Sequence, residues 1–81
     1  MKAIVKITLK SGILDPQGRT VHQALEHLGY ENIERVFVGK MIEIYFPDDM
    51  SEEDARKQTS EMAERLLANP VMEKYTIEIE K

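Results

Sequence analysis

Cysteine and tryptophan are absent from this 81-residue sequence, and histidine occurs only as His22 and His27. Without cysteine there is no disulfide, no thiolate nucleophile and no thiolate metal ligand. The two histidines lie five residues apart in a predicted helix, so they point to different faces and a shared metal ion is not expected. A long uncharged stretch is also missing, because Lys6 and Lys10 interrupt the apolar N-terminal segment. These absences favour a cytoplasmic protein that holds no metal.

Basic residues are outnumbered by acidic ones, eleven to fifteen, which gives a formal net charge of −4 at pH 7. Proteins that bind the phosphates of nucleic acid or of anionic lipid usually carry a basic patch. Only Lys2, Lys6 and Lys10 form a basic row, and no aromatic residue accompanies them for base stacking. The sequence therefore predicts neither nucleic acid nor a membrane as a partner.

The chain is long enough for one small domain over residues 1–81 and too short for two. Hydrophobic residues make up 42% of it, which is enough for a core. A chain of this length buries only about 60% of the surface that its unfolded form exposes, so its stability is marginal. Since neither a disulfide nor a metal supports it, we predict self-association into a homodimer or a homotetramer.

The N-terminal part of the sequence predicts a strand followed by a helix. Apolar side chains alternate with polar ones over residues 2–10, a pattern typical of a strand with one buried face. Asp15 is a suitable N-cap for a helix that begins at Pro16, and Gly29 is a suitable end for it. An alternative start is Thr20, the first residue of a capping box.

The following residues predict a hairpin and a second helix. Apolar positions at 33–38 and 41–46 flank Gly39, which is expected to supply the turn of a tight hairpin. Ser51 is a suitable N-cap for a helix with an acidic first turn, and Asn69-Pro70 ends that helix.

A last strand is predicted over residues 75–80, so the order of elements is βαββαβ. This order predicts an α+β fold, a two-layer ferredoxin-like sandwich in which both helices cover one face of an antiparallel sheet. The other face would be bare, and strand parity places Ile4, Phe37 and Tyr45 on it. We expect the chain to oligomerise through this sheet.

The sequence contains no recognisable catalytic or phosphate-binding motif. Ser11, Ser51 and Ser60 lie outside any G-x-S-x-G motif, and Gly39-Lys40 lacks the spacing of a phosphate-binding loop. Most carboxylates fall in helical ion pairs or on a solvated strand face, where their simplest role is solubility. These patterns indicate a binding surface rather than an active site.

Two segments contain more than a plain connection requires. Residues 13–18 join Ile-Leu to a polar Asp-Pro-Gln-Gly tip at a strand-to-helix corner, although a well-capped helix start explains them equally well. Residues 66–75 place the apolar Val71 and Met72 directly after a helix stop. These two side chains could dock locally or against another subunit.

Several short motifs follow one another over nearly the whole chain. They are Lys10-Ser-Gly-Ile-Leu-Asp-Pro-Gln-Gly18, Ala24-Leu-Glu-His-Leu-Gly29, Val38-Gly-Lys40 and Leu66-Leu-Ala-Asn-Pro70, followed by Glu73 and Tyr75. In this combination the sequence resembles the PurS family, the small subunit of phosphoribosylformylglycinamidine synthase. Phe37 and Ala63 depart from the pattern, because many relatives have Arg and some have Cys at these positions.

The resemblance implies a subunit of a ligase in de novo purine biosynthesis. That enzyme converts formylglycinamide ribonucleotide to its amidine with ATP and with ammonia from glutamine. A large synthetase subunit is expected to hold ATP and magnesium, and a glutamine amidotransferase subunit to release ammonia. The small subunit is expected to bridge the two as a homo-oligomer and to contribute to ammonia transfer. The resemblance places no catalytic, cofactor or metal residue on this chain.

Contact with the larger subunits is expected from polar residues on turns. The candidate contact residues are Asp15, Pro16, Gln17, Gly18, Arg19, Gly39, Lys40, Asn69 and Pro70. A different possibility is a ferredoxin-like regulatory module that binds a small molecule, such as an amino acid, between protomers.

Overall fold

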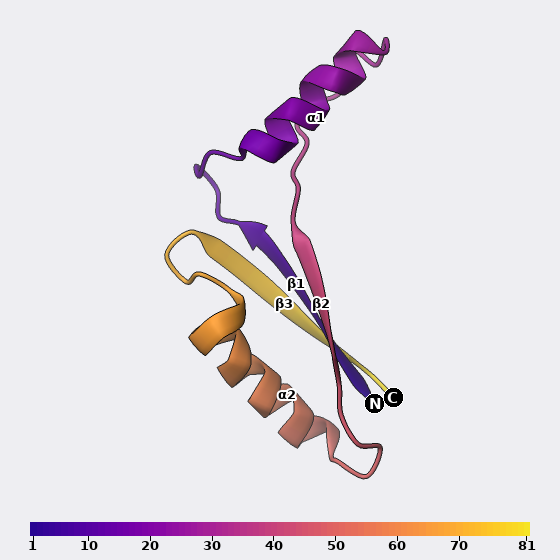
Figure 1. The fold of residues 1–81 in the computed structure, drawn as a ribbon, viewed down its shortest axis with the longest axis vertical. Coiled ribbons are helices and arrows are strands. Elements are labelled where there is room, and N and C mark those ends of the chain that lie inside the picture. The colour runs from indigo at the N-terminus through magenta and orange to yellow at the C-terminus, as the bar shows by residue number, and fades with distance from the viewer.

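The structure is a computed structural model that describes residues 1–81, with three strands and two helices (Figure 1). The strands form one antiparallel sheet in the order β2-β1-β3. The predicted α+β class with an antiparallel sheet is confirmed. The bounds in chain order are β1 Lys2–Leu9, α1 Pro16–His27, β2 Lys40–Tyr45, α2 Glu52–Met62, η1 Ala63–Leu67 (a π-helical turn that continues α2) and β3 Glu73–Glu80.

The core lies between the central strand β1 and helix α2. Ala3, Val5 and Ile7 alternate along β1 and are fully buried or nearly so. Ala55 and Thr59 of α2 are fully buried, and small residues at these positions let the helix approach the sheet closely. Thr59 satisfies its buried hydroxyl by donating to the Ala55 carbonyl at 2.7 Å. The predicted buried face of the first strand is therefore confirmed.

Helix α2 begins and ends where the sequence predicts. The Ser51 hydroxyl accepts a hydrogen bond from the Asp54 N–H at 3.1 Å, and three acidic residues follow in the first turn. The helix widens into the π turn, whose Ala68 N–H donates to the Ala63 carbonyl at 3.0 Å. The helical segment then stops before Asn69-Pro70. None of the helices combines the length and the apolar composition that a membrane crossing requires.

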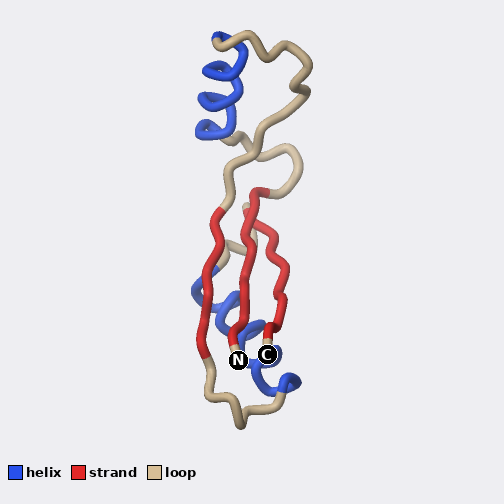
Figure 2. Tube along the Cα trace, turned by 90° about the vertical axis from the view of Figure 1, so that its right-hand side faces the viewer, coloured by secondary structure: helices blue, strands red, loops and turns tan.

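Helix α1 begins at Pro16 with Asp15 as its N-cap, as predicted, and the alternative start at Thr20 is not used. Gly29, with φ of +102°, follows the end of the helix. The position of α1 differs from the prediction, because only α2 covers the sheet. Figures 1 and 2 show α1 beyond one end of the sheet, where it forms an arm with the returning segment of residues 30–39.

The predicted hairpin at Gly39 is wrong. Residues 30–39 form no strand, and the chain passes through Gly39 directly into β2 (Figure 1). Lys40 pairs with Ile7 of β1, so the chain runs straight through Gly39, and the positive φ of a tight turn is found only at Gly12 and Gly29. With this segment continuing β2 outward, the sheet has three strands instead of four, and α1 is carried away from it.

The open face of the sheet also differs from the predicted apolar patch. Ile4 is only 8% exposed, because charged side chains surround it. Lys2 Nζ lies 2.7 Å from Glu43 Oε2, and Lys6 Nζ lies 3.3 Å from Glu78 Oε1. Tyr45 lies at the edge of this face, and Phe37 lies on the arm. Ion pairs therefore cover the middle of the open face, and the apolar side chains exposed on it, Met41 and Tyr45, lie along its β2 edge.

The molecule is elongated. Its principal extents are 50 × 26 × 14 Å and its radius of gyration is 16.1 Å. A compact domain of this length has a radius of gyration of about 12 Å. The difference arises from the arm, which increases the length of the chain without adding to the core.

Candidate functional site

The corner at which the chain leaves the sheet for the arm is organised by Asp15. Its Oδ1 accepts a hydrogen bond from the Gly18 N–H at 3.0 Å, which caps α1. Its Oδ2 accepts one from the Val38 N–H at 3.0 Å. Both hydrogen bonds stabilise the charged carboxylate, the one from the Gly18 N–H most strongly. They therefore lower the pKa of Asp15 below its ordinary value. One carboxylate therefore joins the outgoing and the returning stretch of the arm.

Two glycines allow the backbones at this corner to approach closely. A Cβ at Gly18 would lie 2.2 Å from the Val36 carbonyl oxygen, and a Cβ at Gly39 would lie 2.5 Å from the Ile7 carbonyl oxygen. Any larger residue would force these backbones apart. Gly39 is thus needed for a close approach and not for a turn.

A cleft of about 340 Å³ opens beside this corner, between the end of the sheet and the start of α1. It gathers residues from separate parts of the sequence, and Lys40 Nζ lies 3.9 Å from Glu73 Oε2 across it. Its lining contains five of the candidate contact residues, namely Asp15, Pro16, Gln17, Gly39 and Lys40. The structure therefore brings two distant candidate segments to one place.

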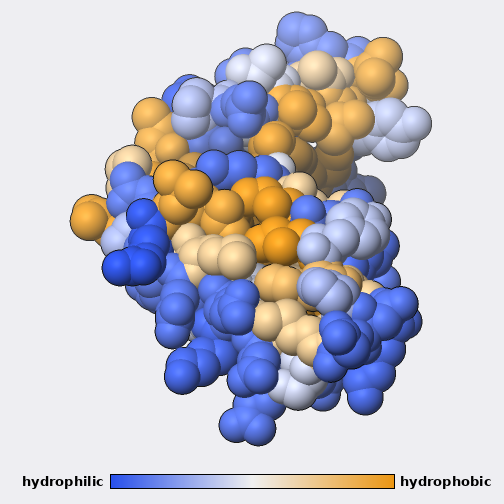
Figure 3. All heavy atoms as spheres, turned by 60° about the horizontal axis from the view of Figure 1, so that its bottom comes forward, coloured by the Kyte–Doolittle hydropathy of each residue, from blue (hydrophilic) through white to orange (hydrophobic).

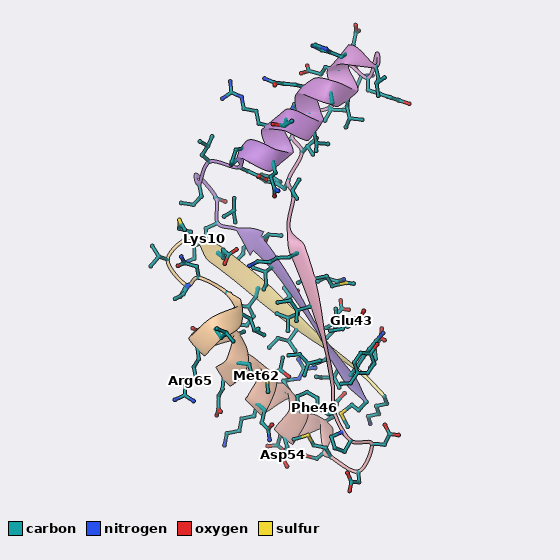
Figure 4. All side chains as sticks on the ribbon, in the orientation of Figure 1. Lys10, Glu43, Phe46, Asp54, Met62 and Arg65 are labelled. Carbon is teal, nitrogen blue, oxygen red and sulfur yellow. The ribbon has the colours of Figure 1, made fainter.

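Asn69 and Pro70 form a second group at the start of β3. The Asn69 N–H donates to Glu73 Oε1 at 2.7 Å, and the Asn69 side chain accepts from the Val71 N–H at 3.0 Å. Lys10 Nζ donates to the Pro70 carbonyl at 2.6 Å, and Figure 4 shows Lys10 at the end of β1 beside this loop. A cavity of about 270 Å³ adjoins this group.

Glu73 connects the two groups and is the residue that sequence reasoning missed. One of its oxygens holds Asn69 and the other faces Lys40, while its side chain is only 18% exposed. Glu73 follows the last of the short motifs in the sequence. Its position after a helix stop, however, predicts no contact with residues 39–40. Arg19, by contrast, is exposed on α1 and does not line the cleft.

Large apolar side chains remain exposed on the arm, around the corner and in the stretch between α2 and β3. Figure 3 shows apolar residues gathered across the middle of one face and toward one end, with hydrophilic residues around them. Leu66 of η1 is 83% exposed, and Val71 in the loop before β3 is 78% exposed. On the corner and the arm the exposed apolar residues are Ile13, Leu14, Val21, Leu28, Tyr30 and Phe37. Surfaces of this kind are typical of association sites.

The polar groups of the site act on the fold itself. The Asp15 oxygens hold backbone amides, and the Tyr75 hydroxyl donates to Glu64 Oε1 at 2.7 Å, which raises the pKa of Tyr75. His22 Nε2 lies 3.1 Å from the Ile33 carbonyl oxygen. No group of three or more histidine and carboxylate side chains is placed to hold a metal ion. The hydrogen-bonding groups of the site are therefore used to hold the chain's own backbone and side chains in place.

The PurS family model, described as phosphoribosylformylglycinamidine (FGAM) synthase, matches residues 2–81. The phosphoribosylformylglycinamidine synthase subunit PurS of Methanocaldococcus jannaschii is 45% identical over 80 residues, which are 99% of this chain and 95% of that protein.

Solved structures agree with this match. The crystal structure of M. jannaschii PurS, described as one of the subunits of formylglycinamide ribonucleotide amidotransferase in the purine biosynthetic pathway, aligns with a TM-score of 0.86 at 45% identity, covering 99% of this chain and 95% of that one. A chain of PurLQS from Thermotoga maritima shares the fold, with a TM-score of 0.72 at 24% identity over 95% of this chain and 93% of that one. The chain belongs to the PurS family of phosphoribosylformylglycinamidine synthase subunits.

Proposed function

We propose that this chain is a non-catalytic bridging subunit of phosphoribosylformylglycinamidine synthase. The observation that carries the proposal is the match to PurS over residues 2–81, the whole length of the fold. The site geometry supports it, because the carboxylates of Asp15 and Glu73 are occupied with holding backbone and neighbouring side chains. The chain would then contribute surfaces to the enzyme and leave bond formation to other subunits.

The proposed partners are the synthetase subunit and the glutamine amidotransferase subunit of the same enzyme. The PurLQS assembly of T. maritima contains a chain of the same fold. In this proposal the synthetase holds ATP, magnesium and the ribonucleotide, and the amidotransferase releases ammonia in the cytoplasm. The small subunit keeps the two together and shortens the path of ammonia between them.

The corner cleft supplies the proposed contact surface for one larger subunit. Gln17 and Lys40 are exposed at its rim. Their backbone is held in place by the Asp15 hydrogen bonds and by the close approaches at Gly18 and Gly39. Fixed polar groups at a rim set the specificity of a contact. Asn69 and Pro70, held through Glu73, extend the same surface toward the start of β3.

The proposed bridge is a homo-oligomer. The arm lies apart from the core, and the elongated shape leaves its apolar side chains uncovered. Covering them with a second copy supplies the stability that a small chain without disulfides requires. Because the open face of the sheet carries ion pairs, the arm is the better candidate for this contact.

A reconstituted enzyme tests the contact surface. In the complex of all three subunits, Gln17→Ala and Lys40→Ala are each expected to weaken subunit association about fivefold or more and to lower glutamine-dependent turnover at limiting subunit concentration. Lys57→Ala, on the exposed side of α2, is the matched control and should change neither. Unchanged association and turnover in both cleft variants would reject this surface.

A second candidate function has one observation in its favour. The cleft presents a cation, Lys40, and an anion, Glu73, within a volume suited to a small zwitterion such as an amino acid. A regulatory module of this kind would show a higher melting temperature of the isolated chain in the presence of glutamine or other amino acids. The absence of any such shift across the amino acids would dismiss it.

A further inference from the structure

A further cavity, of about 290 Å³, lies where the arm leaves the sheet, and the proposed function does not use it. Figures 1 and 2 show this place, at which β1 ends, β3 begins and residues 30–39 run into β2. We call this cavity the arm pocket. It is separate from the corner cleft, with which it shares only Thr8 and Leu9. Its lining consists of Thr8, Leu9, Ser11, Arg35, Phe37 and Lys74.

The pairing of two strands and the course of the arm bring this lining together. Thr8 of β1 is paired with Lys74 of β3, so their side chains lie next to each other on one face of the sheet. That face is the open one, because Thr8 is two residues from Lys6 in the same strand. Arg35 and Phe37 come to the pocket from the arm. The pocket therefore depends on the fold and on no single segment.

The arm pocket is basic, although the chain as a whole is acidic. It is lined by two cations, Arg35 and Lys74, and by no carboxylate. Lys2, Lys6 and Lys40 of the sheet each form an ion pair with a glutamate. Arg35 and Lys74 form none. Two like charges without a counterion repel each other, and a bound anion would relieve this repulsion.

Two hydroxyl groups add uncharged donors to the pocket. Thr8 and Ser11 belong to the lining, and their hydroxyls donate to no other group of the chain. By contrast, the hydroxyls of Thr20 and Thr59 donate to backbone carbonyls. A guanidinium, an ammonium and two hydroxyls are thus free to donate to one ligand. This set of donors favours a ligand that accepts hydrogen bonds through several oxygens.

We propose that the arm pocket binds a small phosphate monoester whose organic part carries a planar ring. A phosphate monoester has nearly two negative charges at pH 7 and three acceptor oxygens, which match two cations and two hydroxyls. A carboxylate has one charge and two oxygens, so it would leave one cation without a counterion. The guanidinium of Arg35 can hold two phosphate oxygens at once, while Lys74 acts as a point charge.

Phe37 supplies the surface for the ring. It is the only aromatic residue of the lining, and it is 59% exposed. The face of an exposed phenyl ring is a platform on which a planar group stacks, as bases do on aromatic side chains. The volume of the pocket lies at the small end of the range for ligand sites, which favours one phosphate and one ring system.

Calorimetric titration of the full chain, in the oligomeric state that it adopts in solution, tests this proposal. The probes are AMP, inorganic phosphate and adenosine. We expect AMP to bind most tightly, and adenosine, which has no phosphate, to bind about tenfold more weakly or less. No binding of AMP at millimolar concentration, or equal affinities for AMP and adenosine, would overturn the proposal. The larger subunits are absent, so the outcome does not depend on the proposed bridging role.

Charge-matched variants locate the site. Arg35→Gln and Lys74→Gln each remove one cation, and each should weaken AMP binding about tenfold. Lys57→Gln removes an exposed cation of α2 and is the control, with an expected change of about twofold or less. Equal weakening by all three variants would indicate a general attraction of charge. That result, or an effect at only one of the two pocket cations, would overturn the site.

A fourth variant tests the role of the ring. Phe37→Leu keeps an apolar side chain without a ring, so it should weaken AMP about fivefold and leave the affinity for inorganic phosphate unchanged. Equal losses for both probes would contradict stacking on Phe37. All the substituted side chains are exposed, and the melting temperature without ligand checks that each variant folds.

Discussion

Asp15 holds two separate stretches of backbone with the two oxygens of one carboxylate. The bond to Gly18 belongs to an ordinary helix cap, and Asp15 before Pro16 predicts it from sequence alone. The bond to Val38 spans 23 residues and depends on where the chain returns, which no local pattern encodes. The contact of Glu73 with Lys40 likewise joins residues that are far apart in the sequence, so no local pattern predicts it.

The pH dependence of stability follows from Asp15. Its pKa is lower in the folded chain than in the unfolded one, so its stabilising effect is present above the unfolded pKa of about 3.9 and is lost as the pH falls through the lower folded value. We expect Asp15→Asn to be less stable than the wild type at pH 7, and the difference to shrink toward pH 2. Urea unfolding of both proteins across this pH range measures it, and a constant difference would show that the charge of Asp15 is unimportant.

At the scale of elements, the parts that the sequence predicts correctly are those whose signals are local. Strand β1 follows from alternation, and α2 from its Ser51 cap, acidic first turn and Asn69-Pro70 stop. The segment 33–38 has the alternation of a strand, but alternation specifies an extended backbone and not its partner. The position of α1 could not be predicted for the same reason, because it depends on that segment continuing β2 outward.

The packing of β1 against α2 gives a prediction at this scale. Ile7 is 1% exposed in the core, so Ile7→Ala removes buried methyl groups and leaves a cavity. It should lower the free energy of unfolding by about 2–5 kcal/mol. Leu66→Ala, at a side chain that is 83% exposed, should change it by only about 0.5 kcal/mol or less. Chemical denaturation of the two variants measures the difference, and equal losses would contradict the assigned core.

At the scale of the whole molecule, a small core is joined to an arm that the core does not cover. Ion pairs cover the middle of the open face of the sheet, while the arm, the β2 edge, η1 and the loop before β3 keep apolar side chains exposed. A molecule built in this way has separate surfaces for separate neighbours. This division accords with a subunit that joins proteins rather than one that transforms a substrate.

Sedimentation of the synthetase and amidotransferase subunits, mixed with and without this chain, tests the bridging role most directly. With glutamine and nucleotide present, the two larger subunits are expected to sediment together only when the chain is added, and all three to move as one species. Association of the two larger subunits to the same extent without the chain would contradict the account.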